Sequence, residues 1–277
     1  MANFRQRHAI YDDWAKYYDL VAGDRTPMVA FYRSLVGDRT RSILELACGT
    51  GTITLALAQH LVECGGTWEQ SRVVGIDESA EMLRIARAKD ARPEWVLGDM
   101  RSPPVRGVFD LVICCYNTVQ SLLTDNDLVR FFRTIRSIVD PHGVFAFDIV
   151  QPDLPYLSKP QEEHLARTVT DERGRHLEHR RTYSYDPKSR VLTIDHRLIE
   201  AGREAAGALT RLRYGYRQYF DAEIERALVA AGFTVRRRFG DFEESPPNAT
   251  AKKQVFVCSP SLPSAGPMFC ARVPRLS

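Results

Sequence analysis

The sequence predicts an α/β fold, a mostly parallel seven-stranded sheet with helices on both faces plus a small antiparallel insertion near the active site. Two observations predict it. Between residues 41 and 150, short apolar runs alternate with amphipathic segments, and repeated strand–helix units form a parallel sheet with right-handed crossovers. After residue 150, strand-like runs follow one another without helices between them, as in antiparallel hairpins.

The N-terminal part predicts two helices and then the first five strands. Ser79 suits the N-cap of one helix, and the apolar run FDLVICC suits a parallel strand covered on both faces. The helices are expected within 8–37 and at 51–62, 79–89 and 125–139, and the strands at 41–47, 72–77, 93–98, 109–115 and 144–150.

The C-terminal part predicts the insertion and the closing elements. Strands at 176–185 and 190–200 flank the turn DPKS, and a third strand is expected at 210–220. A helix at 221–231 should stop at Gly232, a suitable C′ glycine, before strands at 233–239 and 254–258. The expected units are residues 1–150 (lid helices and ligand-binding core), 151–219 (antiparallel insertion), 220–258 (closing elements) and 259–277 (a disordered tail).

Composition excludes several classes of protein. The chain has 277 residues and a net charge of +3 without a basic stripe, so we expect neither nucleic acid nor a membrane surface as partner. No apolar run reaches the roughly 18 residues of a spanning helix, and the N-terminus does not resemble a signal peptide. None of the six cysteines has CxxC spacing, so we expect buried free thiols in a cytoplasmic protein without a metal site.

The ends of the first two expected strands carry the chemistry. Ligands of an open α/β sheet sit outside the carboxyl ends of its strands. In ELACGTGT, Gly49 and Gly51 let the backbone approach a ligand, and Asp77 can accept hydrogen bonds from a ribose diol. Both features also suit NAD. However, Thr54 takes the third glycine position of G-x-G-x-x-G, and Glu45 would repel a pyrophosphate but suits an ammonium group.

Four segments, ELACGTG, VVGIDESAEMLRIAR, WVLGDMR and FDLVICCYN, resemble in order the signatures of class I S-adenosylmethionine-dependent methyltransferases. YDDWAKYYD resembles the tyrosine-rich lid helix of that family. RQYFDAEIERALVAAGF and the strands after it resemble its small-molecule branch, which includes sugar-amine and natural-product N-methyltransferases. The resemblance covers roughly residues 8–258 and implies a Rossmann-like fold.

The resemblance also implies a cofactor site for S-adenosyl-L-methionine and its product S-adenosyl-L-homocysteine. Glu45 and the loop would hold the amino-acid end, although Ala47 stands where many members have the first glycine. Asp77 would bind the ribose, and Asp99 and Met100 the adenine. The expected cofactor-binding residues are Tyr11, Tyr18, Glu45, Ala47, Gly49, Gly51, Asp77, Met82, Asp99, Met100 and Cys115.

The expected catalytic residues are fewer. Tyr116, at the mouth of the fourth strand, should face the transferring methyl group, and the sequence there is not the NPPY of amide and base methyltransferases. Alternation along 214–219 places Arg217 and Tyr219 on one face, which we expect to cover the active site. The sugar-amine branch has a histidine base where this chain has Gln120. The histidines of the insertion, His176, His179 and His196, are expected to be surface residues of strands.

These features predict a cytoplasmic methyltransferase that acts on a small molecule, with N-methylation in a biosynthetic pathway as the first hypothesis. O-methylation of a small carboxylate or phenol is an alternative, because the motifs do not separate the two reactions. A non-catalytic cofactor-binding regulator is another alternative, and an NAD dehydrogenase a further one. The protein is expected to be a monomer or a homodimer.

Overall fold

The computed structural model describes residues 4–159 and 162–261. Its main sheet has seven strands in the order β10-β11-β5-β4-β1-β2-β3, of which β1 to β5 are parallel. The strands are β1 (Ser42–Leu46), β2 (Arg72–Asp77), β3 (Glu94–Leu97), β4 (Phe109–Cys114), β5 (Val139–Val150), β10 (Phe233–Phe239) and β11 (Lys253–Pro260). The predicted α/β fold with a mostly parallel seven-stranded sheet is therefore confirmed.

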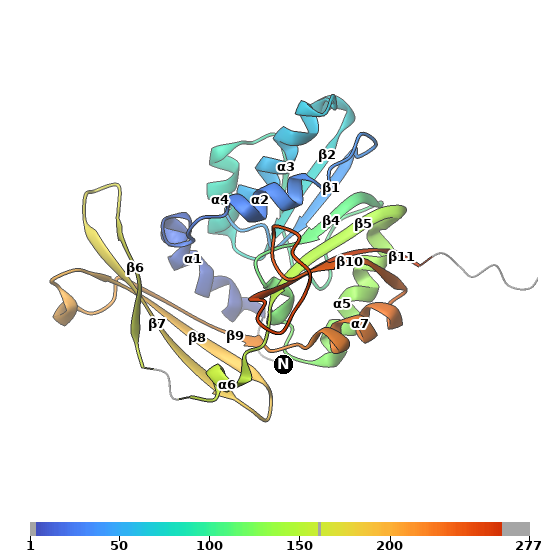
Figure 1. Cartoon of the computed structure of the whole chain (residues 1–277). Helices are drawn as coiled ribbons and strands as arrows, with labels where there is room; N and C mark the ends of the chain where they lie inside the picture. The colour runs from blue at the N-terminus through green and yellow to red at the C-terminus, as the bar shows by residue number, and fades with distance from the viewer. Residues whose placement is uncertain (1–3, 160–161, 262–277) are drawn as a thin grey trace, which may run out of the picture.

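Helices cover both faces of this sheet (Figure 1). Alternate residues of each strand point to opposite faces, so Ile43 packs with α2 (Thr26–Arg33) and α3 (Thr52–Glu63), whereas Leu44 packs with α5 (Asp125–Ile138) and α7 (Asp221–Ala230) on the other face. The Ser79 side chain caps α4 (Ala80–Lys89) as expected, accepting a hydrogen bond from the Met82 amide. Gly232 follows α7 with φ +84°, the conformation of a C′ glycine.

A second, antiparallel sheet has the order β6-β7-β8-β9. Its strands are β6 (His164–Thr170), β7 (His176–Asp186), β8 (Val191–Glu200) and β9 (Thr210–Arg217). We expected three strands. The sequence does not reveal β6, because its residues are nearly all exposed and lack apolar–polar alternation.

Helix α1 (Phe4–Val21) lies between the two sheets (Figure 1). Trp14, Tyr17 and Val21 of α1 form a separate apolar cluster with Leu177, Leu198 and Leu212 of the antiparallel sheet. The N-terminal helix is thereby bound to the insertion, more than 150 residues later in sequence.

The remaining elements are short: η1 (Trp68–Gln70), η2 (Thr118–Ser121), α6 (Leu154–Leu157) and η3 (Glu204–Ala206). Residues 259 and 260, expected at the start of a disordered tail, belong to β11, which pairs with β10 through Pro260. The rest of that prediction, residues 262–277, lies outside the described residues. In the part of the chain that the structure describes, no helix is long and apolar enough to span a membrane.

Candidate functional site

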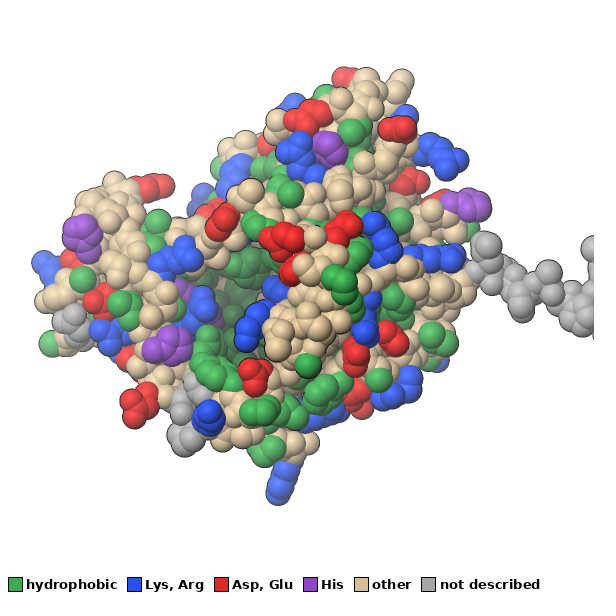
Figure 2. All heavy atoms as spheres, in the orientation of Figure 1, with side chains coloured by type: hydrophobic (Ala, Val, Ile, Leu, Met, Phe, Trp, Pro, Cys, Tyr) green, Lys and Arg blue, Asp and Glu red, His purple; other side chains and the backbone are tan. Residues whose placement is uncertain are grey.

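A cavity of about 850 Å³ opens at the carboxyl ends of the parallel strands. Its walls come from α1, from the loops after β1, β2, β3 and β4, and from the inner face of the antiparallel sheet. Figure 2 shows it as a hollow with apolar side chains inside and basic and histidine side chains toward the antiparallel sheet. Nine expected residues line it: Tyr11, Tyr18, Ala47, Gly49, Asp77, Met82, Asp99, Met100 and Tyr116.

The loop between β1 and α3 needs an unusual backbone. Ala47, Gly49 and Gly51 all have positive φ, +54°, +55° and +78°. A Cβ at Gly51 would lie 2.5 Å from the Trp95 ring, so Gly51 is required by packing and does not itself line the cavity. A non-glycine residue in the left-handed region costs about 1–2 kcal/mol, so Ala47 keeps the loop in a strained conformation.

Glu45 lies beneath this loop, and it does not line the open cavity as we had expected of a ligand contact. Its carboxylate is 2% exposed and accepts a hydrogen bond from the Thr54 hydroxyl. Burial raises the pKa of Glu45 to about 7, although the Thr54 hydrogen bonds and the charge of Arg25 oppose the shift. Thr54, the residue that distinguished this loop from a dinucleotide motif, therefore holds the Glu45 carboxylate in place.

Asp77, at the end of β2, organises two backbone turns and faces the cavity. One carboxylate oxygen accepts from the Gly49 amide at 2.8 Å, and the other accepts from the Ser79 amide at 2.9 Å. Burial raises the pKa of Asp77 to about 6, and these two hydrogen bonds oppose the rise. Each oxygen keeps a further lone pair for a ligand hydroxyl.

Asp99, after β3, is oriented by a residue that the sequence analysis missed. The Arg101 Nε donates to both Asp99 oxygens, at 3.0 and 2.8 Å, and Arg101 also lines the cavity. Met82 and Met100 supply the apolar surfaces beside this carboxylate, so the site combines a flat apolar slot with one hydrogen-bond acceptor.

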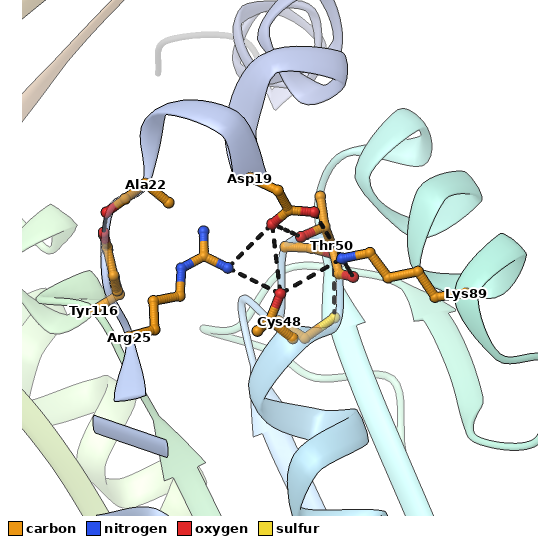
Figure 3. Close-up of polar contacts among 9 residues, drawn as sticks. Asp19, Ala22, Arg25, Cys48, Thr50, Lys89 and Tyr116 are labelled. Atoms are coloured by element: carbon orange, nitrogen blue, oxygen red, sulfur yellow. Dashed lines mark hydrogen bonds and ion pairs between the residues drawn. The ribbon is translucent and has the colours of Figure 1, made fainter. Parts of the chain in front are cut away.

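Arg25 is a second residue that the analysis missed, because it lies in the linker between α1 and α2. Its Nη1 donates to Asp19 at 3.1 Å and to Thr52 at 2.9 Å, while its Nε and Nη2 are buried and have no hydrogen-bond partner. Figure 3 shows the Arg25 guanidinium and Lys89 on either side of Asp19, above the glycine loop. Lys89 Nζ bonds Asp19 at 2.7 Å and the Thr50 carbonyl at 2.9 Å, so charged contacts join the lid helix to the loop.

The end of β4 is held by a partly buried ion pair between Asp148 and Lys253. Tyr116 and Asn117 have positive φ, +65° and +64°, and Asp148 of β5 accepts from both of their amides, at 2.8 and 3.3 Å. Asp148 is fully buried and also accepts from Lys253 Nζ at 2.6 Å and from the Tyr32 hydroxyl at 3.0 Å. The Tyr116 hydroxyl donates to the Ala22 carbonyl at 2.7 Å (Figure 3), so it ties the strand end to the lid.

The prediction for Arg217 and Tyr219 is wrong in its choice of face. Neither lines the cavity. Tyr219 is fully buried in the main core and donates to the Leu122 carbonyl, and Arg217 pairs with Asp125 at 2.7 Å. The opposite face of the same strand, with Tyr214 and Tyr216, covers the cavity instead, because alternation defines two faces without deciding which one points inward.

The expectation for Cys115 is corrected by burial, and Gln120 has a structural role. Cys115 is absent from the cavity lining and packs in the core on the α2–α3 side of the sheet, beside Tyr32. Gln120 lines the cavity, but both ends of its amide are occupied: Oε1 accepts from the Val150 amide at 2.9 Å, and Nε2 donates to the Arg217 carbonyl at 3.2 Å. Gln120 therefore links β5 to β9 and cannot replace a histidine base.

His179 and His196 are buried, 1% and 7% exposed, which corrects the expectation of surface residues. They form a chain with Tyr214: His179 Nε2 lies 2.8 Å from His196 Nδ1, and His196 Nε2 lies 3.0 Å from the Tyr214 hydroxyl. Burial, helped by the charge of Arg181, lowers the pKa of His179 to about 4 and that of His196 to about 3. Both imidazoles are thus neutral at physiological pH. Tyr214 in turn stacks on Tyr11 of the lid, with ring centroids 6.2 Å apart.

Comparison with known proteins agrees with this geometry. Residues 43–143 match the family described as "Methyltransferase domain". The chain is 32% identical over 146 residues to the putative methyltransferase YqeM of Bacillus subtilis (strain 168), an alignment that covers 51% of this chain and 49% of YqeM. The chain thus aligns with about half the length of that relative.

Two solved structures share the fold over most of the chain. The CcbJ methyltransferase from Streptomyces caelestis superimposes with a TM-score of 0.72 at 23% identity, over 91% of this chain and 98% of CcbJ. The sugar N-methyltransferase KedS8 from Streptoalloteichus sp. ATCC 53650 has a TM-score of 0.66 at 19% identity, over 87% and 90%. The predicted Rossmann-like fold is confirmed by these structures, and the predicted resemblance to methyltransferases agrees with the family match over residues 43–143.

Proposed function

We propose that this chain, whose residues 43–143 are a methyltransferase domain, transfers a methyl group from S-adenosylmethionine to a small molecule. The observation that carries the proposal is the shared cavity. Strand-end carboxylates and the glycine loop line one side of it, and an antiparallel sheet lines the other. A cavity of about 850 Å³ holds ligands of this size.

The side of the cavity lined by the strand-end carboxylates and the glycine loop, here called the cofactor half, would hold the separate groups of S-adenosylmethionine. The side lined by the antiparallel sheet is called the acceptor half. Asp77 would accept the two ribose hydroxyls with the lone pairs left by Gly49 and Ser79. Asp99 would accept from the adenine amine, between Met82 and Met100. Tyr11 and Tyr18 would close over the cofactor, since the Tyr18 ring lies 3.5 Å from the site of a Gly49 Cβ.

The amino-acid end would be held by opposite charges. Glu45 interacts electrostatically with Arg25, whose Nε and Nη2 lack partners. Neither side chain lines the cavity, but a carboxylate beneath the loop and a guanidinium above it would favour, through the loop, the ammonium and carboxylate of an α-amino acid. Arg25 was not expected from the sequence, and it would supply the positive charge for the carboxylate of the cofactor.

When bound, the cofactor supplies an electrophilic methyl group, and the chain has to align an acceptor behind it and exclude water. Tyr116 faces the cavity at the end of β4, and its hydroxyl locks the lid linker over that point. A neutral amine needs no strong base at this step. N-methylation is therefore our first proposal, supported by the fold shared with a sugar N-methyltransferase.

O-methylation of a carboxylate or phenol is the second candidate. A hydroxyl must lose its proton as it is methylated, and the neutral His196 imidazole, bonded to the cavity-lining Tyr214, offers a route for that proton. The N and O reactions are separated by the mass and fragmentation of the methylated product.

The test has two steps. Isothermal titration of S-adenosylhomocysteine into the purified protein should show binding at micromolar concentration, and NADH should not bind. The protein is then incubated with S-adenosylmethionine and each compound of a metabolite library. Formation of S-adenosylhomocysteine should rise with a subset of amines or hydroxyl compounds. Absence of S-adenosylhomocysteine binding would refute the proposal, and binding without turnover for any compound would favour the regulatory alternative.

A further inference from the structure

The inner face of the antiparallel sheet carries one cation among apolar and aromatic side chains. Alternate residues of β7 to β9 point into the cavity, among them Leu192, Ile194 and Tyr183. Arg181 of β7 belongs to this face and lines the cavity. It is partly buried, and its Nε is shielded from solvent.

Arg181 combines partial burial with the lack of an acidic partner among the described residues. Arg101 is bound to Asp99, and Lys253 is bound to Asp148. Arg213 also has no ion pair among the described residues, because Asp195, its partner in register, pairs with Arg211, but the Arg213 side chain is exposed to solvent. Within residues 4–159 and 162–261, Arg181 has no ion pair, and its buried Nε has no hydrogen-bond partner.

The groups that surround Arg181 come from every neighbouring strand. His164 of β6 and His196 of β8 are its partners in register. His179 and Tyr183 flank it on the inner face of β7, and Tyr214 of β9 lies close enough to feel its charge. These side chains are imidazoles and phenols, and the charge of Arg181 depresses the pKa of His179 and His196.

An unpaired, partly buried guanidinium is unfavourable for folding unless a ligand compensates it. Arginine suits this task because its planar donors bind carboxylate or phosphate oxygens in pairs. The chain keeps the charge on the acceptor wall, opposite the strand-end carboxylates that would bind the cofactor.

We propose that the methyl acceptor carries an anionic group, a carboxylate or a phosphate ester, which Arg181 binds while the apolar body of the acceptor packs on the antiparallel sheet. This inference rests on the proposed function, since it names the class of acceptor for the same site. It places the anion beside Tyr214 and leaves the nucleophile to face the end of β4.

The test compares aryl ligands that differ in the charge of the head group, with 3-phenylpropionate and its amide as the pair matched in shape. 3-Phenylpropionate, phenyl phosphate and the neutral 3-phenylpropionamide are titrated into protein saturated with S-adenosylhomocysteine. At least one anion should bind about tenfold more tightly than the amide, the size of one charge-assisted hydrogen bond. The anion that binds more tightly distinguishes the carboxylate from the phosphate source.

Arg181→Gln should remove the preference for the anion, and Arg181→Lys should retain part of it. Arg180→Gln is the matched control, because Arg180 lies on the opposite face of β7 and is bound to Glu178 at 2.6 Å; this variant should behave as wild type. The affinity for S-adenosylhomocysteine should be unchanged in Arg181→Gln. The free energy of unfolding of this variant should be equal to that of the wild type or higher, because the substitution breaks no ion pair.

Equal affinity for anion and amide in the wild type, no binding of either anion, or the same loss in both glutamine variants would overturn the inference. These outcomes leave the proposed function standing if S-adenosylhomocysteine binds. Failure of that binding would refute the proposed function itself.

Discussion

The two halves of the cavity are built by different means. On the side of the main sheet, Asp77 and Asp99 are carboxylates held by hydrogen bonds from residues within about 30 positions along the chain, including Gly49, Ser79 and Arg101. On the side of the antiparallel sheet, the polar groups are neutral imidazoles, tyrosines and the unpaired Arg181. The carboxylates of the first half are preorganised by these hydrogen bonds, whereas Arg181 of the second half has no ion pair among the described residues.

This difference suits one half to binding the cofactor and the other to selecting the acceptor. Each carboxylate of the cofactor half already accepts hydrogen bonds, which fixes its direction before a ligand arrives. The acceptor half offers an apolar surface with one partly buried cation, Arg181, so its selectivity would come from the charge and shape of the acceptor. Four predictions test this comparison, from the largest expected effect to the smallest.

The junction between the halves should be the most sensitive point. Asp148→Ala removes the acceptor for Lys253, Tyr32 and the amides of Tyr116 and Asn117. Breaking a fully buried ion pair from one side costs about 3–5 kcal/mol. Because the Lys253 side chain is 23% exposed and also donates to Asn117, we expect a loss at the lower end of this range, about 3 kcal/mol, in the free energy of unfolding measured with urea. The double variant Asp148→Ala/Lys253→Met should be more stable than Asp148→Ala alone, because no unpaired charge remains. Additive losses would show that the ion pair is not what holds the strand end.

Asp77→Ala should abolish most of the affinity for S-adenosylhomocysteine, by about 100-fold or more, since hydrogen bonds to a charged group contribute about 1.5–3 kcal/mol each. Glu81→Ala on α4 is the control, because its carboxylate is exposed and pairs only with the exposed Arg84. Isothermal titration measures both variants. Equal affinities for the two would exclude Asp77 from the cofactor half.

The affinity for S-adenosylhomocysteine should depend on pH through Glu45. Its pKa of about 7 in the free protein means that an ammonium group bound near the loop favours loss of the Glu45 proton. Affinity is then nearly complete at pH 8 and falls as the pH drops through 7, by about tenfold from pH 8 to pH 6. Glu45→Gln should bind more weakly at pH 8 and give a flatter profile. The same slope in both proteins would assign the titration to another group, such as Asp77, whose pKa is about 6.

In the acceptor half, acid should lower the stability of the fold through His179 and His196. His179 and His196 stay neutral in the folded protein to about pH 4 and pH 3, whereas the unfolded chain protonates its histidines near pH 6.5. Stability is therefore complete above about pH 6.5 and declines below it, by up to about 1.4 kcal/mol per pH unit for each histidine. NMR titration of the imidazole Cε1–H signals should show both histidines untitrated at pH 5.5. Arg181→Gln should raise both pKa values. Normal titration near pH 6.5 in the wild type would contradict the buried chain.

Much of the cofactor half is predictable from the sequence because its residues are coupled to local elements. A strand that ends in Asp77 must place that carboxylate at the sheet edge, and Ser79 must cap the next helix, wherever the rest of the chain lies. Arg25 and Arg101 escaped prediction for a related reason: a lone arginine in a loop has no periodicity, and only its contacts with Asp19 and Asp99 reveal its role.

The orientation of the acceptor half could not be predicted from local sequence patterns. The alternation along β9 correctly separates Tyr214 and Tyr216 from Arg217 and Tyr219, yet both faces contain aromatic and polar residues. Burial of Tyr219 in the main core decides the orientation. In the same way, His179 and His196 are 17 positions apart and meet only because β7 and β8 pair in one register.

The sequence by itself therefore determined the parallel sheet, the glycine loop with its unusual Thr54, and the carboxylates at the strand ends, because apolar periodicity and turn chemistry act within a few residues. Only the tertiary structure decided which face of the antiparallel sheet covers the cavity, that Gln120 links β5 to β9, and that Arg181 stands without an acid. Those properties depend on strand register and on packing between segments that are far apart in the sequence, such as Gln120 and Arg217 at 97 positions, which no local pattern encodes.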